Sequence, residues 1–286
     1  MKKITNEKLF DWFRDNRGEF DAVVFDIDGV LLLNHRVTPG SKEFLNYLRG
    51  NDIPYSLLTN DGCNSPEEKI SHLLADGLRF ETEEIISCGH GLEALALEPG
   101  AKDKPYYVMG SLGEPCYAET AGLKVIRDVE KIHECGGVII GERRFDWQLT
   151  INAAVNFFRV NPSAGLIVPN PDFYFPVGHG NIELAPGAIA LMIRDILATQ
   201  KINIQPRYLG KPYQVIYEIN HRHLETRSRR SIPKNRVLMV GDSMLSDIPG
   251  AVDFGYRSAL MLSGITKLEN LDLFERQPDY IFNAIG

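Results

Sequence analysis

The chain has 286 residues, of which 44% are hydrophobic and 24% are charged, and its formal net charge is -7. This composition is typical of a folded globular protein, and the length fits one large domain or two smaller ones. No global positive field exists to attract phosphate backbones, so nucleic acid and membrane surfaces are not expected partners. The basic segment 221–230 differs from the rest of the chain, and we interpret it as a solvated helix end and loop.

No targeting or membrane-spanning segment is expected. The N-terminal residues lack the apolar core of about 7–15 residues that a signal peptide needs. No apolar run approaches the ~20 residues of a membrane helix. The cysteines, Cys63, Cys88, Cys116 and Cys135, are far apart and form no CxxC pair. They are therefore predicted to be free thiols in a reducing cytoplasm.

Short apolar runs alternate with helical patterns from the beginning of the chain. Residues 21–27 are predicted to form a strand, because strands buried on both faces appear as continuous apolar runs. A helix is predicted next, with Thr38 as its N-cap, Pro39 at its first position and Gly50 at its end. Residues 55–60 form the second predicted strand. The pattern favours a parallel sheet with covering helices.

The middle of the chain contains its own set of predicted elements. A helix is predicted to begin at Ser65, because Pro66 follows it and Glu68 completes a capping box. Further strands are predicted at 105–110, 136–141 and 164–170. Residues 153–158 are predicted to form the centre of a helix. The block of about 120 residues from 85 to 206 is long enough for its own core.

The last part of the chain returns to the first pattern. Strands are predicted at 236–242, 258–264 and 280–285. The expected architecture is a doubly wound parallel α/β sheet formed by residues 1–84 and 207–286, with residues 85–206 inserted as an α/β cap domain.

Two carboxylates, Asp26 and Asp28, follow the first predicted strand, and Gly29 allows a sharp turn after them. A carboxylate can attack phosphorus and form an aspartyl phosphate. A second carboxyl group can protonate the leaving alkoxide and later deprotonate water. The alternative is a surface turn, since Asp and Gly are common turn formers.

Polar side chains also follow other predicted strands. Thr59 and Asn60 end the second strand and could donate hydrogen bonds to phosphate oxygens, although both residue types are common in loops. Lys211 precedes a predicted helix start and could neutralise a carboxylate or a phosphate, although most lysines are solvated. Open α/β sheets bind ligands at this strand edge.

Two more aspartates, Asp242 and Asp247, follow the strand predicted at 236–242. Mg²⁺ prefers oxygen ligands and usually takes one or two protein carboxylates. Asp242 could supply one and Asp26 the other. The alternative is helix N-capping, which needs no metal.

The order of these motifs resembles the haloacid-dehalogenase-like hydrolase superfamily, whose four motifs are similar to DIDGV, LLTN, LGKP and GDSMLSD. The position of the cap-sized block and the Asn170-Pro171-Asp172 segment resemble the NagD-like phosphatases, subclass IIA. The similarity extends over nearly the whole chain. It implies the fold described above and an enzyme that hydrolyses a small phosphomonoester.

The resemblance implies a role for each matching residue. Asp26 would be the nucleophile and a metal ligand, and Asp28 would be the general acid/base and offer its backbone carbonyl to the metal. Asp242 would be a metal ligand, and Asp247 would orient the second shell of the metal. The implied cofactor is Mg²⁺.

The remaining implied groups bind the substrate. Thr59 and Asn60 would bind the transferring phosphoryl group, and Lys211 would offset its charge. Positioning and charge stabilisation by such groups are chemically sufficient for phosphoryl transfer. The substrate itself is left open among sugar phosphates, nucleotides, phosphoglycolate and pyridoxal phosphate.

The cap would select the leaving group, and Asp172, Phe173 and Phe175 are the candidate contacts. The aromatic rings could stack on a flat substrate, or they could pack the core of the cap itself. His90 and His179 could also bind substrate, although isolated histidines are usually structural. The resemblance also implies that a homodimer through the cap is possible.

Three features depart from the family pattern. Asp61 stands where many members have a neutral residue, and its charge could weaken substrate binding or select a cationic substrate. Cys63 and Asn64 make the rest of that loop atypical, and residues 221–230 lengthen a connection.

Several other functions are less compatible with the motifs. Haloacid dehalogenases lack the second aspartate, ion-pumping ATPases carry threonine there, and mutase caps are usually inserted after the first motif. A non-catalytic binding or scaffold protein on the same fold remains the alternative from another class, although the intact acidic and lysine motifs speak against it.

Overall fold

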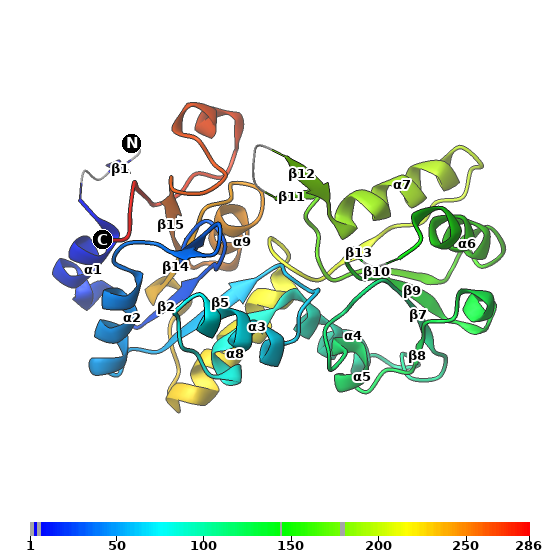
Figure 1. Ribbon diagram of the computed structural model, residues 1–286, viewed down its shortest axis with the longest axis horizontal. Helices are drawn as coiled ribbons and strands as arrows, with labels where there is room; N and C mark the ends of the chain where they lie inside the picture. Colours follow the sequence, from blue (N-terminus) through cyan, green and yellow to red (C-terminus); the bar gives the residue numbers. More distant parts are fainter. Residues whose placement is uncertain (1–2, 5–6, 144, 178–180) are drawn as a thin grey trace. The chain divides into compact units, whose positions relative to one another are not determined.

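The computed structural model describes residues 3–4, 7–143, 145–177 and 181–286 (Figure 1). Its contacts divide the chain into two compact units. The first contains Met1–Thr59, Ile70–Ile86 and Lys211–Gly286, and the second contains Asn60–Lys69 and Ser87–Gly210. The second unit thus includes residues 60–69, which lie outside the cap range 85–206 expected from the sequence.

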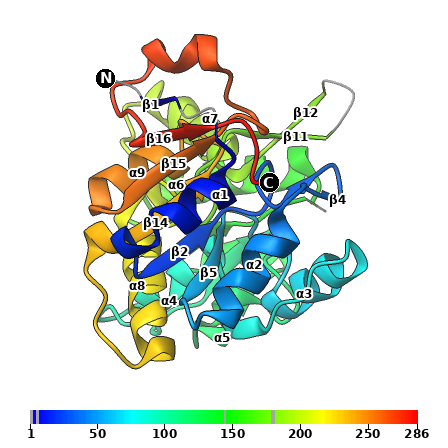
Figure 2. The same ribbon diagram turned by 90° about the vertical axis from the view of Figure 1, so that its left-hand side faces the viewer.

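Within the described residues, the first unit is built on a seven-stranded sheet, and Figure 2 shows its central strands side by side. In spatial order its strands are β1 (Lys3–Ile4), β16 (Tyr280–Phe282), β15 (Arg257–Met261), β14 (Val237–Gly241), β2 (Ala22–Phe25), β5 (Tyr55–Thr59) and β6 (Ile85–Ser87). The pairings from β1 through β5 are parallel. The predicted parallel α/β sheet is therefore confirmed.

Helices cover both faces of this sheet. Successive side chains of a strand point to opposite faces, and those of β2 are apolar and buried on both. The helices are α1 (Leu9–Asp15), α2 (Ser41–Gly50), α3 (Pro66–Ala75), α8 (Gln214–Ser228) and α9 (Asp247–Phe254). Val23 and Phe25 of β2 belong to the buried cluster of α1 and α2. Ala22 and Val24 belong to the buried cluster of α8 and α9. The continuous apolar run of β2 is thus explained by burial on both sides.

The second unit has a separate core. Its described strands form a five-stranded parallel sheet in the order β13 (Arg207–Tyr208), β10 (Gly165–Val168), β9 (Gly137–Ile140), β7 (Tyr106–Met109) and β8 (Val125–Ile126). Its helices are α4 (Leu92–Ala96), α5 (Tyr117–Thr120), α6 (Trp147–Val160) and α7 (Pro186–Ala198). Side chains of α6 and α7 pack with the sheet in one buried cluster.

Two short antiparallel strand pairs lie outside the two larger sheets in the described part of the chain. β3 (Leu32–Leu33) pairs with β4 (Arg36–Val37) in the first unit, and β11 (Tyr174–Pro176) pairs with β12 (Ile182–Leu184) in the second. In the described part of the chain, no helix combines the length and the hydropathy needed to cross a bilayer.

The start of α2 differs from the prediction. The helix begins at Ser41 and its N-cap is Gly40, with φ of 85°, so Thr38 is not the N-cap and Pro39 is not in the helix. The Thr38 hydroxyl instead donates a hydrogen bond of 2.7 Å to the carbonyl of Val30. Burial of this threonine against the preceding loop outweighs the local capping pattern.

The capping box predicted for α3 is confirmed. The Glu68 amide donates to the Ser65 hydroxyl at 3.2 Å, and the Ser65 amide donates to the Glu68 carboxylate at 2.7 Å. Both bonds satisfy amide groups that have no partner inside the helix.

The basic segment 221–230 forms the end of α8 and the turn after it. Arg227 donates to the backbone carbonyl of Tyr55 at 3.0 Å and to the carboxylate of Glu84 at 3.3 Å. Arg230 donates to the carbonyl of Asp21 at 3.1 Å. Two of its arginines therefore bind backbone carbonyl groups of the first unit, so the segment is not simply solvated.

We expect Arg227→Ala to lower the free energy of unfolding by about 1–2 kcal/mol, because a carbonyl and a carboxylate lose a charged donor. Urea unfolding measures this change. Arg222→Ala, which alters an exposed arginine of the same helix, is the matched control and should change stability by about 0.5 kcal/mol or less. Equal effects of the two variants would contradict a structural role for Arg227.

Candidate functional site

The candidate site of the first unit lies at the carboxyl edge of its sheet. Asp26 directly follows β2, Thr59 ends β5, and Asp242 directly follows β14. Because β14, β2 and β5 are parallel neighbours, their carboxyl ends lie at one edge. Lys211 and Asp247, the first residue of α9, also lie at this edge.

A buried ammonium group connects two of the aspartates. Lys211 Nζ lies 2.8 Å from Asp26 Oδ1 and 2.7 Å from Asp247 Oδ1. The side chains of Lys211 and Asp247 are 2% and 0% exposed, whereas 13% of the Asp26 side chain is exposed. The lysine is thus a fixed structural charge. Of the three side chains, that of Asp26 is the most accessible to solvent.

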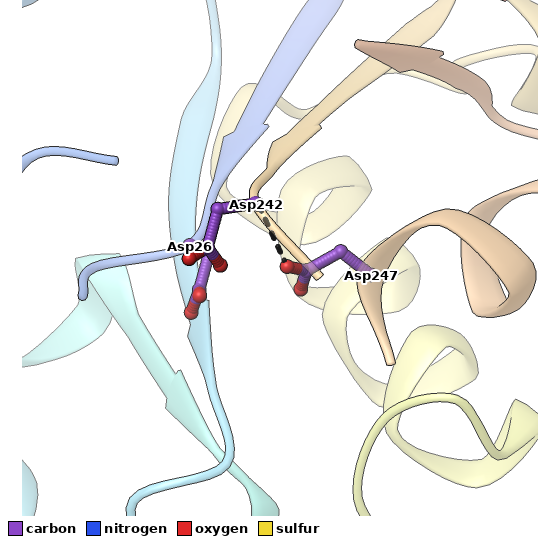
Figure 3. A group of neighbouring side chains, drawn as sticks. All are labelled: Asp26, Asp242 and Asp247. Carbon is purple, nitrogen blue, oxygen red and sulfur yellow. Dashed lines mark hydrogen bonds between the residues drawn. The ribbon is translucent and has the colours of Figure 1, made fainter. Parts of the chain in front are cut away.

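The carboxyl groups of Asp26, Asp242 and Asp247 form a cluster in which one oxygen of each lies within 4.8 Å of the others. They come from three different segments, as Figure 3 shows. The dashed line in Figure 3 is the bond from the Asp242 amide to Asp247 Oδ2, at 3.1 Å. The Ser243 amide donates to the same oxygen at 3.1 Å.

The hydrogen bonds distinguish the roles of the three carboxylates. Asp247 accepts bonds at both oxygens, from Lys211 at Oδ1 and from two amides at Oδ2. Asp26 uses Oδ1 for Lys211, and Asp242 uses Oδ2 for the amide of Ile265. Among the contacts of the described residues, this leaves Asp26 Oδ2 and Asp242 Oδ1 best placed to ligate a cation.

The charges in this cluster are not balanced by the protein alone. Burial raises the pKa of Asp26 well above its ordinary value, and the charges of Asp247 and Asp242 raise it further although Lys211 opposes them. Burial and the charge of Asp247 raise the pKa of Asp242 to about 7. Burial lowers the pKa of Lys211, but Asp247 and Asp26 more than offset this and raise it. Such a cluster fits a divalent cation.

Glycines allow the close approach of backbone to the Asp242 carboxylate. Gly29 has a φ of +83°, and a Cβ atom there would lie 2.1 Å from Asp242 Oδ2. A Cβ atom at Gly264 would lie 1.8 Å from the same oxygen. Any side chain at either position would displace the carboxylate.

The other predicted groups of this edge are also placed by the structure. Thr59 is buried, with 3% exposure, whereas Asp28 is exposed in the turn after β2. The turn is fixed by the Gly29 amide, which donates to the carbonyl of Leu32 at 2.8 Å. The catalytic and phosphate-binding roles of these residues stay predictions.

The predicted residues of the second unit include Asn60 and Asp172, which lie close together. Asn60 Nδ2 donates to both oxygens of Asp172, at 3.1 Å each. Phe173 is 48% exposed and Tyr174 is 45% exposed. Among the described residues, neither they nor the half-buried Phe175 belong to the buried cluster of this unit. The exposed rings of Phe173 and Tyr174 therefore do not pack the core of the cap, whereas the alternative stays open for Phe175.

Asp61 is neutralised by a lysine of α3 and by donors of its own loop. Its carboxylate lies 3.2 Å from Lys69 Nζ and accepts hydrogen bonds from the amide of Cys63 and the side chain of Asn64, at 2.8 and 3.0 Å. Burial raises the pKa of Asp61, but Lys69 and these donors more than offset this and lower it. A cationic substrate is therefore not needed to balance this charge.

Histidine contacts and two further charged residues also matter in this unit. His90 caps a local turn, where the Ser87 amide donates to its Nδ1 at 3.0 Å, and His179 lies outside the described residues. Sequence reasoning missed Lys69 and Glu142, which are 4% and 7% exposed. Lys69 looks like an ordinary helix lysine, and the partners of Glu142 are distant in sequence, so local patterns carried no signal for either residue.

Comparison with known proteins agrees with this geometry. The family described as haloacid dehalogenase-like hydrolase matches residues 23–124, and the family described as HAD-hydrolase-like matches residues 208–286. The chain belongs to the haloacid dehalogenase-like hydrolases. The predicted family and fold class are therefore confirmed.

Individual relatives place the chain among the phosphatases of this family. It is 27% identical to a dihydroxyacetone phosphatase of Corynebacterium glutamicum, over 91% of this chain and 88% of that protein. It is 28% identical to an acid sugar phosphatase of Staphylococcus haemolyticus, over 93% of this chain and 94% of that protein. The solved structure of NagD from Escherichia coli is similar, with a TM-score of 0.75 and 25% identity over 93% of this chain and 97% of that chain.

The charge imbalance of this haloacid dehalogenase-like site predicts a pH-dependent stability when no divalent cation is present. Burial and the charge of Asp247 raise the pKa of Asp242 to about 7 in the folded chain, from an ordinary value of 3.8 that we take for the unfolded chain. The folded chain therefore binds more protons between these values, so the free energy of unfolding should fall as pH rises, by at most about 1.4 kcal/mol per pH unit from this group.

Urea unfolding at several pH values in the presence of a chelator measures this dependence. We expect the free energy of unfolding of Asp242→Asn to fall less steeply with pH than that of the wild type, because an amide carries no charge. At about pH 8 the variant should be the more stable protein. An identical dependence in both proteins would contradict the charge imbalance assigned to Asp242.

Proposed function

We propose that this enzyme is a Mg²⁺-dependent phosphatase that hydrolyses the phosphomonoester of a small sugar or triose phosphate. The single observation that carries the proposal is the partly exposed carboxylate Asp26, held 2.8 Å from a buried lysine at the strand edge. The names of the relatives support the substrate class, since one is a dihydroxyacetone phosphatase and another an acid sugar phosphatase.

In the first half of the proposed reaction, a carboxylate oxygen of Asp26 attacks phosphorus. The new O–P bond forms as the P–O bond of the ester breaks, giving an aspartyl phosphate and an alkoxide. Asp28 donates a proton to the departing alkoxide. Lys211 holds Asp26 in place through its bond to Oδ1.

In the second half, Asp28 removes a proton from water, which attacks the phosphorus of the aspartyl phosphate. The P–O bond to Asp26 breaks, which releases inorganic phosphate and regenerates the free carboxylate of Asp26. The exposed position of Asp28 permits this exchange with solvent. Thr59, and Asn60 after it, are proposed to donate hydrogen bonds to the phosphoryl oxygens.

The carboxylates of Asp26 and Asp242 and the backbone carbonyl of Asp28 are proposed to hold the metal. Asp247 would orient Lys211 and the Asp242 backbone rather than ligate, because both of its oxygens already accept hydrogen bonds. One carboxylate oxygen of each of the three aspartates lies within 4.8 Å of the others, and Mg²⁺ prefers such oxygen ligands. Bound Mg²⁺ would polarise the phosphoryl group and offset its negative charge.

A substrate with a flat ring is the second candidate. The observation that favours it is the exposure of Phe173 and Tyr174, at 48% and 45%. A nucleotide or pyridoxal phosphate could stack on such rings. A cytoplasmic location and a homodimer through the cap stay predictions.

We expect Asp26→Asn to lower the turnover of p-nitrophenyl phosphate with Mg²⁺ by about a thousandfold or more, because an amide is a poor nucleophile. The amide oxygen can still accept a hydrogen bond from Lys211, so thermal unfolding should show an intact fold. Phosphate release measures the activity.

Asp21→Asn is the matched control for this variant, because it makes the same change before the opposite end of β2, and it should retain turnover. A chelator should remove the wild-type activity and added Mg²⁺ should restore it. Full activity of Asp26→Asn would refute the assigned nucleophile. No wild-type activity on a broad phosphomonoester panel would favour the non-catalytic alternative.

The substrate class is tested by comparing kcat/KM over triose phosphates, sugar phosphates, phosphoglycolate, nucleotides and pyridoxal phosphate. We expect triose or sugar phosphates to exceed the flat-ring substrates by about tenfold or more. A preference for flat rings that is lost in Phe173→Ala would instead support the second candidate.

A further inference from the structure

Two loops of the second unit meet at one carboxylate oxygen. Residues 60–63 follow β5, and residues 170–172 follow β10. Glu142 Oε1 accepts a hydrogen bond from the amide of Gly62 at 2.9 Å and another from Asn170 Nδ2 at 3.0 Å. A single side chain thus connects segments that are more than 100 residues apart in sequence.

The backbone of Glu142 is itself fixed. It follows the end of β9, and Ser111 follows the neighbouring strand β7 by two residues. The Ser111 amide donates to the Glu142 carbonyl at 2.6 Å, and the Glu142 amide donates to the Ser111 carbonyl at 2.8 Å. The carboxylate therefore projects from a rigid part of the sheet, which can define the position of a loop.

A second connection closes the network. Asn170 Oδ1 accepts a hydrogen bond from the amide of Asp172 at 2.9 Å. The carboxylate of Asp172 in turn accepts from Asn60 Nδ2 at 3.1 Å through both oxygens. The path from Gly62 through Glu142, Asn170 and Asp172 thus returns to Asn60, two residues before its beginning. Both the backbone of this loop and the amide side chain of Asn60 are oriented by it.

Burial of Glu142 is costly, which argues against a space-filling role. Burial raises its pKa to about 7, and the charge of Asp61 contributes to this rise. Lys69 and the donors to its carboxylate lower the pKa only in part, and the buried thiol of Cys88 is a further neighbour. An apolar residue would fill the same place without this cost. The carboxylate is explained by its two donors.

We propose that Glu142 is a positioning residue, which holds the Asn60–Gly62 loop in the conformation that phosphoryl transfer requires. This inference rests on the proposed function, because that function assigns phosphate binding to Thr59 and Asn60. Glu142 itself acts through the loop and contacts no reacting atom.

The first test compares Glu142→Ala with Glu142→Gln. The alanine variant loses the acceptor of both hydrogen bonds, and we expect its kcat/KM to fall by about tenfold to 100-fold through misplacement of the loop. The glutamine variant keeps an oxygen acceptor of the same shape and should stay within about threefold of the wild type. The glutamine variant thus tests whether an uncharged acceptor in the same position is enough to keep kcat/KM.

Asn170→Ala breaks the same network from the other side, so it decides the question if Glu142→Ala does not fold. It should lower kcat/KM by a similar factor. The double variant should be little worse than the more damaged single variant, because both changes interrupt one path. Ile193→Val, a change in the buried cluster of this unit, is the control for general destabilisation and should keep wild-type kcat/KM.

Amide hydrogen exchange at Gly62 provides a measurement that does not depend on turnover. Exchange should be faster in Glu142→Ala and should remain as in the wild type in Glu142→Gln. If the wild type has no phosphatase activity, the proposed function fails, whereas this measurement still tests whether Glu142 holds the loop.

Three results would overturn the inference. One is wild-type kcat/KM in Glu142→Ala or in Asn170→Ala. Another is an equal loss in Glu142→Gln and Glu142→Ala, which would show that charge rather than position matters. The third is unchanged exchange at Gly62 in Glu142→Ala.

Discussion

The geometry of the first unit depends on one buried ammonium group. Lys211 contacts both Asp26 and Asp247, and it is almost fully buried between them. Without this charge, two carboxylates would be buried side by side without compensation, which is among the most unfavourable arrangements in a protein. The lysine allows acidic groups to collect at the strand edge.

Most of the fold could be predicted from local patterns, because buried parallel strands are continuously apolar and motifs at their carboxyl ends must converge. Asp26, Asp242 and Lys211 were identified in this way, and their contacts require no further sequence signal. The start of α2 could not be predicted, because Thr38 looks like a cap but serves the preceding loop. Only the tertiary structure decides between these two uses of one hydroxyl group.

The second unit shows the other limit of sequence reasoning. The pattern around Asp61 indicated an unusual negative charge, but its partner Lys69 looked like an ordinary lysine of a helix. The loop at Asn60 was identified as a phosphate-binding candidate, whereas Glu142 was not noticed at all. Its partner Gly62 is 80 residues away. Such a bond arises from the meeting of separate strand ends, which no single segment encodes.

The convergence of distant strand ends also affects how the chain is made. Asp26 is synthesised long before Lys211 and Asp247, and the segments between them contain the whole second unit. A growing chain in which residues 237–247 have not yet been synthesised has strand β2 without its neighbour β14, and Asp26 without its full set of neighbouring charges. Loop closure over such separations costs entropy and slows folding. The carboxylate edge is therefore assembled only after residues 237–247 have been synthesised, and a shorter chain carries no preformed site.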